Sequence, residues 1–258
     1  MNRTGLIIAL GLALVIGVVF GVHPEYDLRL AALFYDPAAK TFPLKADALA
    51  SFARNGAMWV AWAFAVPAIV ALAVKMFRPD RPLFMSGRAI VFLLLTLLLS
   101  AGILTNLTFK SHWGRPRPVM VTEFGGPWKF MAWWDPRGEC GKNCSFFSGE
   151  GATAFWTLAP AALTPPALRP LAYAGAVTFG ILTSALRMAF GGHFFTDVSI
   201  AGLVAFLVIW LVHGYIYRWP STRKNDAEID AALTRFAWPG YRFRERLLGR
   251  DVGPAPPR

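Results

Sequence analysis

The chain has 258 residues, of which 55% are hydrophobic and only 16% are charged. A soluble domain usually carries about a quarter charged residues, so this composition excludes an ordinary water-soluble protein and indicates a membrane protein. The formal net charge is +11, but the basic residues cluster between apolar stretches. That distribution fits membrane topology and anionic headgroups better than nucleic acid. We therefore expect membrane lipids and no nucleic acid as partners, with the oligomeric state left open.

Six apolar segments are candidates for helices that cross the bilayer, which takes about 20 residues. Backbone polar groups in lipid must bond to one another, so these segments are expected to be helices. In chain order they cover residues 6–22, 57–77, 89–109, 151–163, 171–190 and 195–217. The fourth is short. The first could be a signal peptide, but it is long for one and lacks a convincing cleavage site, so a retained helix is expected.

The predicted fold is an all-α, polytopic membrane protein with a bundle of six transmembrane helices. Residues 1–56 would hold the first helix and an amphipathic segment at residues 28–34 that lies in the interface. Residues 57–217 would form the functional core. Residues 218–258 would form a basic cytoplasmic tail, with a surface helix followed by a disordered end.

Charges in the loops predict the orientation, because short cytoplasmic loops are rich in lysine and arginine. Three arginines follow the second segment and nine basic residues follow Tyr217, so both regions and the N-terminus are assigned to the cytoplasm. The first loop, in which Arg54 is placed, is also basic and argues weakly against this orientation. The long loop between the third and fourth segments then lies outside. Its four tryptophans indicate that it rests on the membrane surface, as an anchor or as a lid.

A polar cluster joins the fifth and sixth apolar segments. His193 and Asp197 are four residues apart, so at the start of a helix they would share one face. A carboxylate that accepts the proton of one ring nitrogen leaves the other nitrogen nucleophilic. Arg187 could hold two phosphate oxygens through its planar guanidinium. The alternative is a histidine near a helix end with only a structural role.

A second cluster follows the third apolar segment. Lys110 and Arg117 could be anchors that reach the membrane interface and no more. Two prolines rigidify the segment, however, and would aim Arg117 at a fixed point. Preorganised cations stabilise the charge on a transferring phosphoryl group. The neighbouring Arg115 receives no definite role, and His112 is interpreted as an interfacial residue.

The remaining cluster immediately precedes the fourth apolar segment. Ser148 and Gly149 would expose backbone N–H groups at a helix N-terminus, which binds anions readily. The alternative is an ordinary N-cap, with Glu150 favourable to the helix dipole. Cys140 and Cys144, in the long loop, lack partner ligands for zinc. A disulfide is favoured over two free thiols if the loop faces an oxidising compartment.

These residues match a known pattern. The chain resembles the type 2 phosphatidic acid phosphatase family, the membrane branch of a superfamily shared with the vanadium haloperoxidases. Its motifs are K-x6-RP, PSGH and SR-x5-H-x3-D. The matching residues are Lys110 to Pro118, Ser148-Gly149, and Arg187, His193 and Asp197, with Leu186 in place of the third motif's serine. In the second motif Phe147 replaces proline and Glu150 replaces histidine.

The resemblance implies a lipid phosphatase that needs no metal or other cofactor. His193 would attack phosphorus and form a phosphohistidine, and Asp197 would orient His193. The phosphate would be held by Lys110, Arg117, Arg187, Ser148 and the N–H of Gly149. In the family the histidine of the second motif protonates the leaving oxygen. We therefore expect Glu150 to be that acid, or to assist it. This role requires a raised pKa, which partial burial would favour and the nearby cations would oppose.

Two alternatives use the same residues. A lipid-binding or transport protein could hold phosphate in this pocket without hydrolysis, and the glutamate substitution favours it. A haloperoxidase is disfavoured because the site sits inside a membrane bundle. The substrate stays open among undecaprenyl pyrophosphate, phosphatidylglycerophosphate, phosphatidate and a phosphorylated lipid A. Short loops and the lack of eukaryotic targeting signals suggest a bacterial inner membrane, with the active site facing the periplasm.

Overall fold

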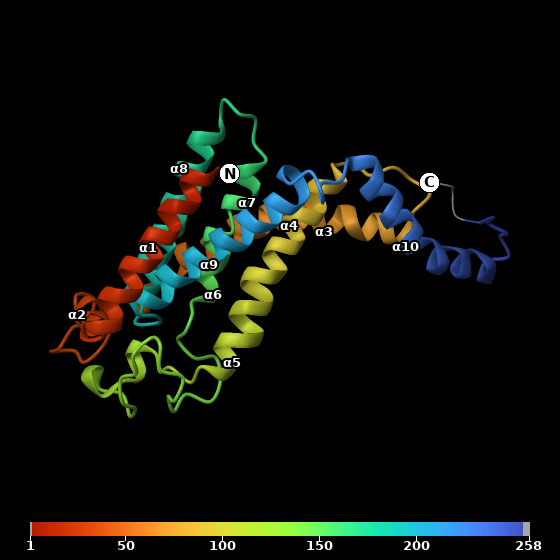
Figure 1. Ribbon diagram of the computed structural model, residues 1–258. Helices are drawn as coiled ribbons and strands as arrows, with labels where there is room; N and C mark the ends of the chain where they lie inside the picture. The colour runs from red at the N-terminus through yellow and green to blue at the C-terminus, as the bar shows by residue number, and fades with distance from the viewer. Residues whose placement is uncertain (1, 255–258) are drawn as a thin grey trace. The chain divides into compact units, whose positions relative to one another are not determined.

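The computed structural model describes residues 2–254, and over that range every regular element is a helix (Figure 1). Five helical stretches are long and apolar enough to cross a membrane. They are α1 (Arg3–Val22), α3 (Ala48–Phe77), the stretch Gly87–His112, α8 (Arg169–Ala189) and the stretch Phe195–Arg218. The third stretch comprises α4 (Gly87–Leu97), the π-helical η2 (Leu98–Phe109) and α5 (Lys110–His112); the last comprises α9 (Phe195–His213) and η5 (Gly214–Arg218). The prediction of an all-α, polytopic membrane protein is confirmed.

The fourth predicted segment forms two short helices, α6 (Gly149–Phe155) and α7 (Leu158–Ala162). The Thr157 hydroxyl donates to the carbonyl of Ala154 at the break, and Pro160 has no backbone N–H to continue the helical ladder. Trp156 is fully buried and donates its indole N–H to the Thr96 hydroxyl at 2.9 Å. The segment is therefore held inside the protein and is shorter than the about 20 residues that span a bilayer.

The second predicted segment begins at Ala48 rather than at residue 57. The Asp47 carboxylate accepts the N–H of Ala50 at 2.6 Å, which is the hydrogen bond of an N-cap. The first turns then contain Ala48, Leu49, Ala50 and Ala53, and alanine and leucine are strong helix formers. The loop assignment of Arg54 is therefore wrong, because Arg54 lies on α3, in its second turn.

By packing, the chain divides into two compact units. One contains the residues up to Ala61 together with Thr96–Trp210, and the other contains Trp62–Leu95 and the residues from Leu211 onward. The three-part division expected from the sequence concerns function rather than packing and stays a prediction. All of the predicted site residues lie in the first unit.

Within the first unit, α6 packs against α8 and η2. Two glycines, on α8 and α9, make room for the Phe155 ring of α6. A Cβ atom at Gly180 of α8 would lie 2.4 Å from the ring of Phe155, and one at Gly202 of α9 would lie 2.7 Å from it. Both distances are shorter than any real contact, so the Phe155 ring fits only because these positions carry no side chain. This packing sets the position of the N-terminus of α6.

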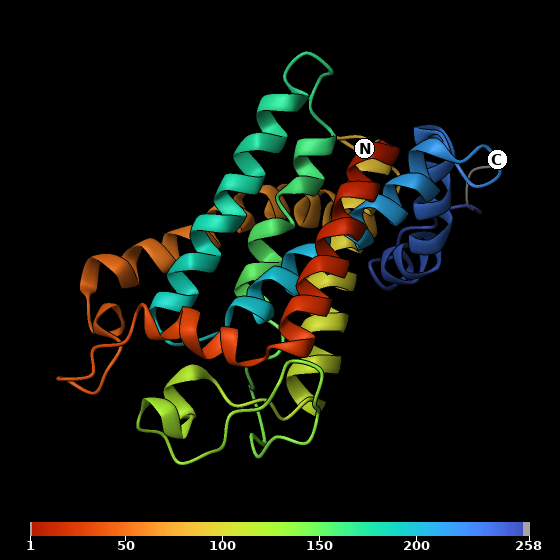
Figure 2. The same cartoon turned by 60° about the vertical axis from the view of Figure 1, so that its left-hand side comes forward.

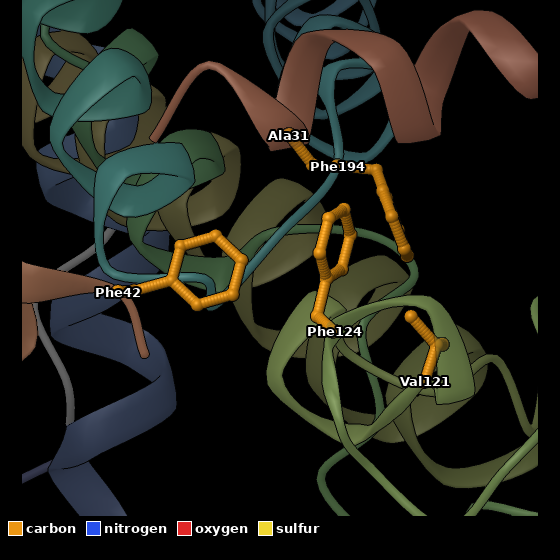
Figure 3. Close-up of a cluster of buried hydrophobic side chains, with 5 residues drawn as sticks. All are labelled: Ala31, Phe42, Val121, Phe124 and Phe194. Carbon is orange, nitrogen blue, oxygen red and sulfur yellow. The ribbon is translucent and has the colours of Figure 1, made fainter. Parts of the chain in front are cut away.

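The long loop between α5 and α6 packs on α2 (Glu25–Ala32), and Figures 1 and 2 show the two side by side. The loop contains the short turns η3 (Pro118–Met120) and η4 (Thr122–Phe124), and η1 (Pro43–Lys45) precedes α3. Their shared core is a cluster of buried side chains, shown in Figure 3, made of Ala31, Phe42, Val121, Phe124 and Phe194. Phe194 is the neighbour of His193, so this cluster fixes the backbone next to the predicted nucleophile.

The second unit contains α10 (Asp226–Leu247), which is the predicted surface helix of the tail. Asn225 and Glu228 form a capping box at its start. Lys75 of α3 is buried and forms an ion pair with Asp230 of α10 at 2.9 Å. The disordered end predicted after this helix includes residues 255–258, which lie outside the described residues.

Candidate active site

His193 lies in the turn between α8 and α9 and is 1% exposed. Its Nδ1 is 2.8 Å from the carbonyl oxygen of Ser145, which can only accept, so Nδ1 carries the proton and Nε2 keeps its lone pair. Burial, followed by the charges of Arg187, Arg117 and Lys110, lowers the pKa of His193 well below its ordinary 6.5. The imidazole is therefore neutral, which is the form that acts as a nucleophile.

Asp197 lies close to His193 but does not accept the proton of its ring, which corrects the expected direct hydrogen bond. Asp197 Oδ2 and His193 Nδ1 are 3.9 Å apart, beyond hydrogen-bond distance. Asp197 Oδ2 instead accepts the Ser145 hydroxyl at 2.5 Å and the N–H of Phe194 at 2.8 Å. The second bond resembles the return bond of a capping box, which draws the carboxylate toward its own helix start. Asp197 thus acts on the imidazole indirectly: it holds Ser145, and the Ser145 carbonyl orients the ring.

A fully buried arginine lies behind Asp197. Arg115 donates to Asp197 Oδ1 at 2.5 Å, to Asp27 Oδ2 at 2.8 Å and to the carbonyl of Met131 at 2.9 Å. Thr196 donates its N–H and its hydroxyl to Asp27. Buried charges need such partners. The sequence assigned no role to Arg115 and none to Asp27, because a single buried carboxylate on an amphipathic helix has no pattern of its own.

Lys110 and Arg117 meet at one residue of the long loop. Arg117 donates to the Asn143 carbonyl at 2.9 and 3.1 Å and to its side-chain oxygen at 2.8 Å. Lys110 Nζ lies 3.3 Å from the same side-chain oxygen. Asn143 has a positive φ of 52° and lies between Cys140 and Cys144, which form a disulfide bond. A small covalently closed loop therefore holds both cations of the first motif.

Glycine makes room for the cations at two points. A Cβ atom at Gly192 would lie 2.5 Å from a guanidinium nitrogen of Arg187, and one at Gly149 would lie 3.3 Å from Lys110 Nζ. Ser148 is the N-cap of α6, and its hydroxyl accepts the N–H of Gly151 at 3.1 Å. The capping alternative for Ser148 is therefore present in the structure. A phosphate contact from Ser148 and Gly149 stays a prediction.

Phe147, at the position of the family's proline, is buried in an apolar cluster. Its neighbours there are Ala101, Phe146, Ala152 and Ala201. The apolar packing of this side chain holds the backbone immediately before Ser148, which is the task that a rigid proline would perform. Among the residues that the structure describes, no cluster of histidine, cysteine and carboxylate side chains could hold a metal ion.

Glu150 is held by two arginines. Its carboxylate accepts hydrogen bonds from Arg54 of α3 at 2.5, 2.9 and 3.1 Å, and Oε2 lies 3.3 Å from Nε of Arg187. Burial by itself would raise the pKa of Glu150, but the bonds from Arg54 and the charges of Arg187 and Lys110 lower it below the ordinary 4.5. The cations thus outweigh burial in this arrangement, so the raised pKa that an acid requires is absent and Glu150 is ionised.

The structure thus brings the predicted residues of all three clusters to one place. The charges of Arg187, Arg117 and Lys110 act together on His193, and Glu150 touches Arg187. The site also includes Arg54, Ser145, Asn143, Arg115 and Asp27, which the sequence did not single out. Fold and geometry define a class of protein: a helical membrane protein with a buried, neutral histidine among cationic side chains.

Comparison with known proteins narrows this class. The model of the PAP2 superfamily matches residues 89–221, and the chain belongs to this superfamily. It is 32% identical over 219 residues to the lipid A 4'-phosphatase of Francisella tularensis subsp. novicida, covering 84% of this chain and 98% of that protein. It is 40% identical over 113 residues to the lipid A 4'-phosphatase of Rhizobium leguminosarum, covering 44% of this chain and 48% of that protein.

A lipid A 4'-phosphatase of Rhizobium etli is 39% identical over 112 residues, which cover 43% of this chain and 44% of that protein. Both rhizobial alignments therefore span less than half of each relative. No solved structure matches the chain. Together with the five apolar helices, the matches support a multi-pass bacterial membrane protein that is a lipid phosphatase. They do not favour the non-hydrolytic binding or transport alternative.

Proposed function

We propose that this lipid phosphatase hydrolyses a phosphate monoester on the sugar headgroup of a lipid of the lipid A kind. The reaction would pass through a phosphohistidine at His193. The observation that carries the proposal is the neutral, buried imidazole of His193, with Nε2 free, in the field of three cations. The Francisella relative, aligned over 98% of its length, supports the substrate class.

We place the site on the periplasmic side of a bacterial inner membrane. The charges of the loops support this orientation. The disulfide between Cys140 and Cys144 supports it independently, because disulfides form and persist in the periplasm and are rare in the cytosol. The loop that carries this disulfide also holds Lys110 and Arg117, so the site and the loop share one side.

The reaction has two steps. Nε2 of His193 attacks phosphorus while the ester P–O bond breaks, and Lys110, Arg117 and Arg187 balance the charge on the phosphoryl oxygens. The Ser145 carbonyl stabilises the proton on Nδ1 as the ring becomes positive. Water then attacks phosphorus and passes a proton to the Glu150 carboxylate, which gave its own proton to the leaving oxygen in the first step. The P–N bond breaks, and the neutral imidazole and inorganic phosphate are released.

The leaving oxygen needs a proton in the first step. A carboxylate paired with Arg54 and Arg187 stays ionised, so Glu150 has no proton to donate while that pairing lasts. Once a phosphate binds Arg54 and Arg187 in place of Glu150, the negative charge of the phosphate raises the pKa of Glu150 and favours its protonation. Glu150 therefore fits the role of acid only in the substrate complex.

Phosphate release from purified protein, without added metal, tests the proposal. The panel is lipid A, undecaprenyl pyrophosphate, phosphatidylglycerophosphate and phosphatidate, and we expect the highest kcat/KM for lipid A. His193→Gln should lower kcat by about 10⁴-fold or more. Glu150→Gln should lower it by about 10²-fold or more if Glu150 is the acid. An active His193→Gln protein would exclude this nucleophile, a preference for phosphatidate would exclude the substrate class, and a fully active Glu150→Gln protein would exclude the acid.

A further inference from the structure

The carboxylate of Glu150 joins guanidinium groups from two different helices. Arg54 of α3 donates to both of its oxygens, and Arg187 of α8 approaches Oε2 at 3.3 Å. Arginines bind the non-bridging oxygens of a phosphate in the same way, with planar guanidinium groups that share the oxygens. Glu150 therefore offers the arginines the same kind of contact as the substrate, with less charge.

The contact with Arg187 is incomplete. The Arg187 side chain is only 5% exposed, yet its Nε makes no hydrogen bond with any residue that the structure describes. A buried donor without an acceptor is unfavourable, and such groups in native proteins call for an explanation. A ligand oxygen that accepted this N–H would remove the defect. Arg187 is thus better suited to an incoming anion than to Glu150.

The pair can also open. The Arg54 side chain is 39% exposed and that of Glu150 is 21% exposed, whereas both members of the Arg115–Asp27 pair are fully buried. A partly exposed ion pair is weak, because water screens it and both side chains can move. An anion that arrives from outside can therefore reach the Arg54 guanidinium and compete for it.

We propose that Arg54 is a fourth phosphate-binding residue, supplied by α3 from outside the three motifs, and that Glu150 is an internal anion which the lipid phosphate displaces from Arg54 and Arg187. The inference rests on the proposed function and extends it to specificity. A phosphate monoester carries nearly two negative charges near pH 7, with a second pKa of about 6, and competes well against one carboxylate. A phosphodiester carries a single charge and competes poorly, so the pair selects monoesters.

Binding of inorganic phosphate to the purified full-length protein, measured by calorimetry, tests the inference without turnover. Arg54→Ala should weaken binding by about 10- to 100-fold, which is the typical effect of losing hydrogen bonds to a charged group. Glu150→Gln should act in the opposite direction and tighten binding, since the competing charge is gone. The matched control is Arg78→Ala, which removes an exposed arginine paired with Asp80 just beyond α3 and should leave binding unchanged.

Monomethyl and dimethyl phosphate extend the same measurement. The wild-type protein should bind the monoester more tightly, and Glu150→Gln should reduce that preference. If Arg54→Ala proves unstable, Arg54→Lys keeps the charge but loses the bidentate geometry, and it should weaken binding by a smaller factor.

Two results would overturn the inference. A purely structural ion pair predicts that Arg54→Ala and Glu150→Gln weaken phosphate binding and lower the Tm together. Unchanged affinity in both variants would be equally decisive. These outcomes differ from failure of the proposed function, in which the wild-type protein would bind phosphate as expected but hydrolyse no lipid phosphate. If hydrolysis depends on His193 but phosphate binding does not depend on Arg54 or Glu150, the inference fails and the proposed function stands.

Discussion

Replacing Asp27 by alanine should perturb the active site indirectly, through the buried residues that support His193. Asp27 lies on α2, fully buried, and accepts the N–H and hydroxyl of Thr196 and one N–H of Arg115. Arg115 in turn holds Asp197, and Asp197 holds Ser145, whose carbonyl orients His193. Three residues, Arg115, Asp197 and Ser145, therefore stand between the substitution and the imidazole.

The expected magnitude follows from burial. Removing one partner of a fully buried ion pair typically costs about 3–5 kcal/mol, because the other charge stays without compensation. For a chain of this size each 1 kcal/mol lowers Tm by about 2–4 °C, so Asp27→Ala should lower it by roughly 6–20 °C. Asp27→Asn keeps one acceptor oxygen and should cost less, about 1–3 kcal/mol.

Thermal unfolding in detergent and kcat on a lipid phosphate measure the two effects. Glu25→Ala is the control, since Glu25 is exposed on the same helix, and surface changes usually stay within about 0.5 kcal/mol. We expect Asp27→Ala to lower both the Tm and kcat. Wild-type values of both would refute the idea that Asp27 supports the catalytic histidine through Arg115.

Two further predictions concern the loop and the histidine. Reducing the Cys140–Cys144 disulfide should raise KM several-fold, because the closed loop places Asn143 against the phosphate-binding cations; an unchanged KM under reductant would contradict this. The pKa of His193 is lowered on folding, so below about pH 6.5 the unfolded chain binds more protons and the folded protein loses stability. The Tm should therefore fall as the pH is lowered from about 7.5 to about 5.5, and it should fall less in His193→Gln. Equal dependence of Tm on pH in the two proteins would exclude His193 as the cause.

The membrane helices were largely predictable. Burial in lipid requires long apolar helices, so the segment expected at residues 171–190 closely matches α8 (Arg169–Ala189). Arg187, His193 and Asp197 could be singled out for the same reason, because charged side chains next to an apolar helix are rare unless they have a role. The short length of the fourth segment was also predictable, but its division into two helices and the burial of Trp156 against Thr96 were not.

The partners of those residues were not predictable. Arg54 meets Glu150 across 96 positions of sequence, and Asp27 meets Arg115 across 88. Contacts between distant positions leave no local periodicity, and a single polar residue on a helix looks the same whether it faces a partner or water. The start of α3 was also missed, since an alanine-rich helix after Asp47 has few of the apolar side chains that mark a membrane segment.

The amino-acid sequence alone predicted that this chain crosses a membrane as helices, and it singled out His193, Lys110, Arg117 and Arg187 as the candidates for phosphate chemistry. These features depend on composition and short spacing, which a linear pattern records. Only the tertiary structure decided that Ser145 rather than Asp197 hydrogen-bonds to the imidazole, and that Glu150 is ionised between Arg54 and Arg187. Protonation and orientation depend on which charges and carbonyls surround a side chain, and those neighbours come together only when the chain folds.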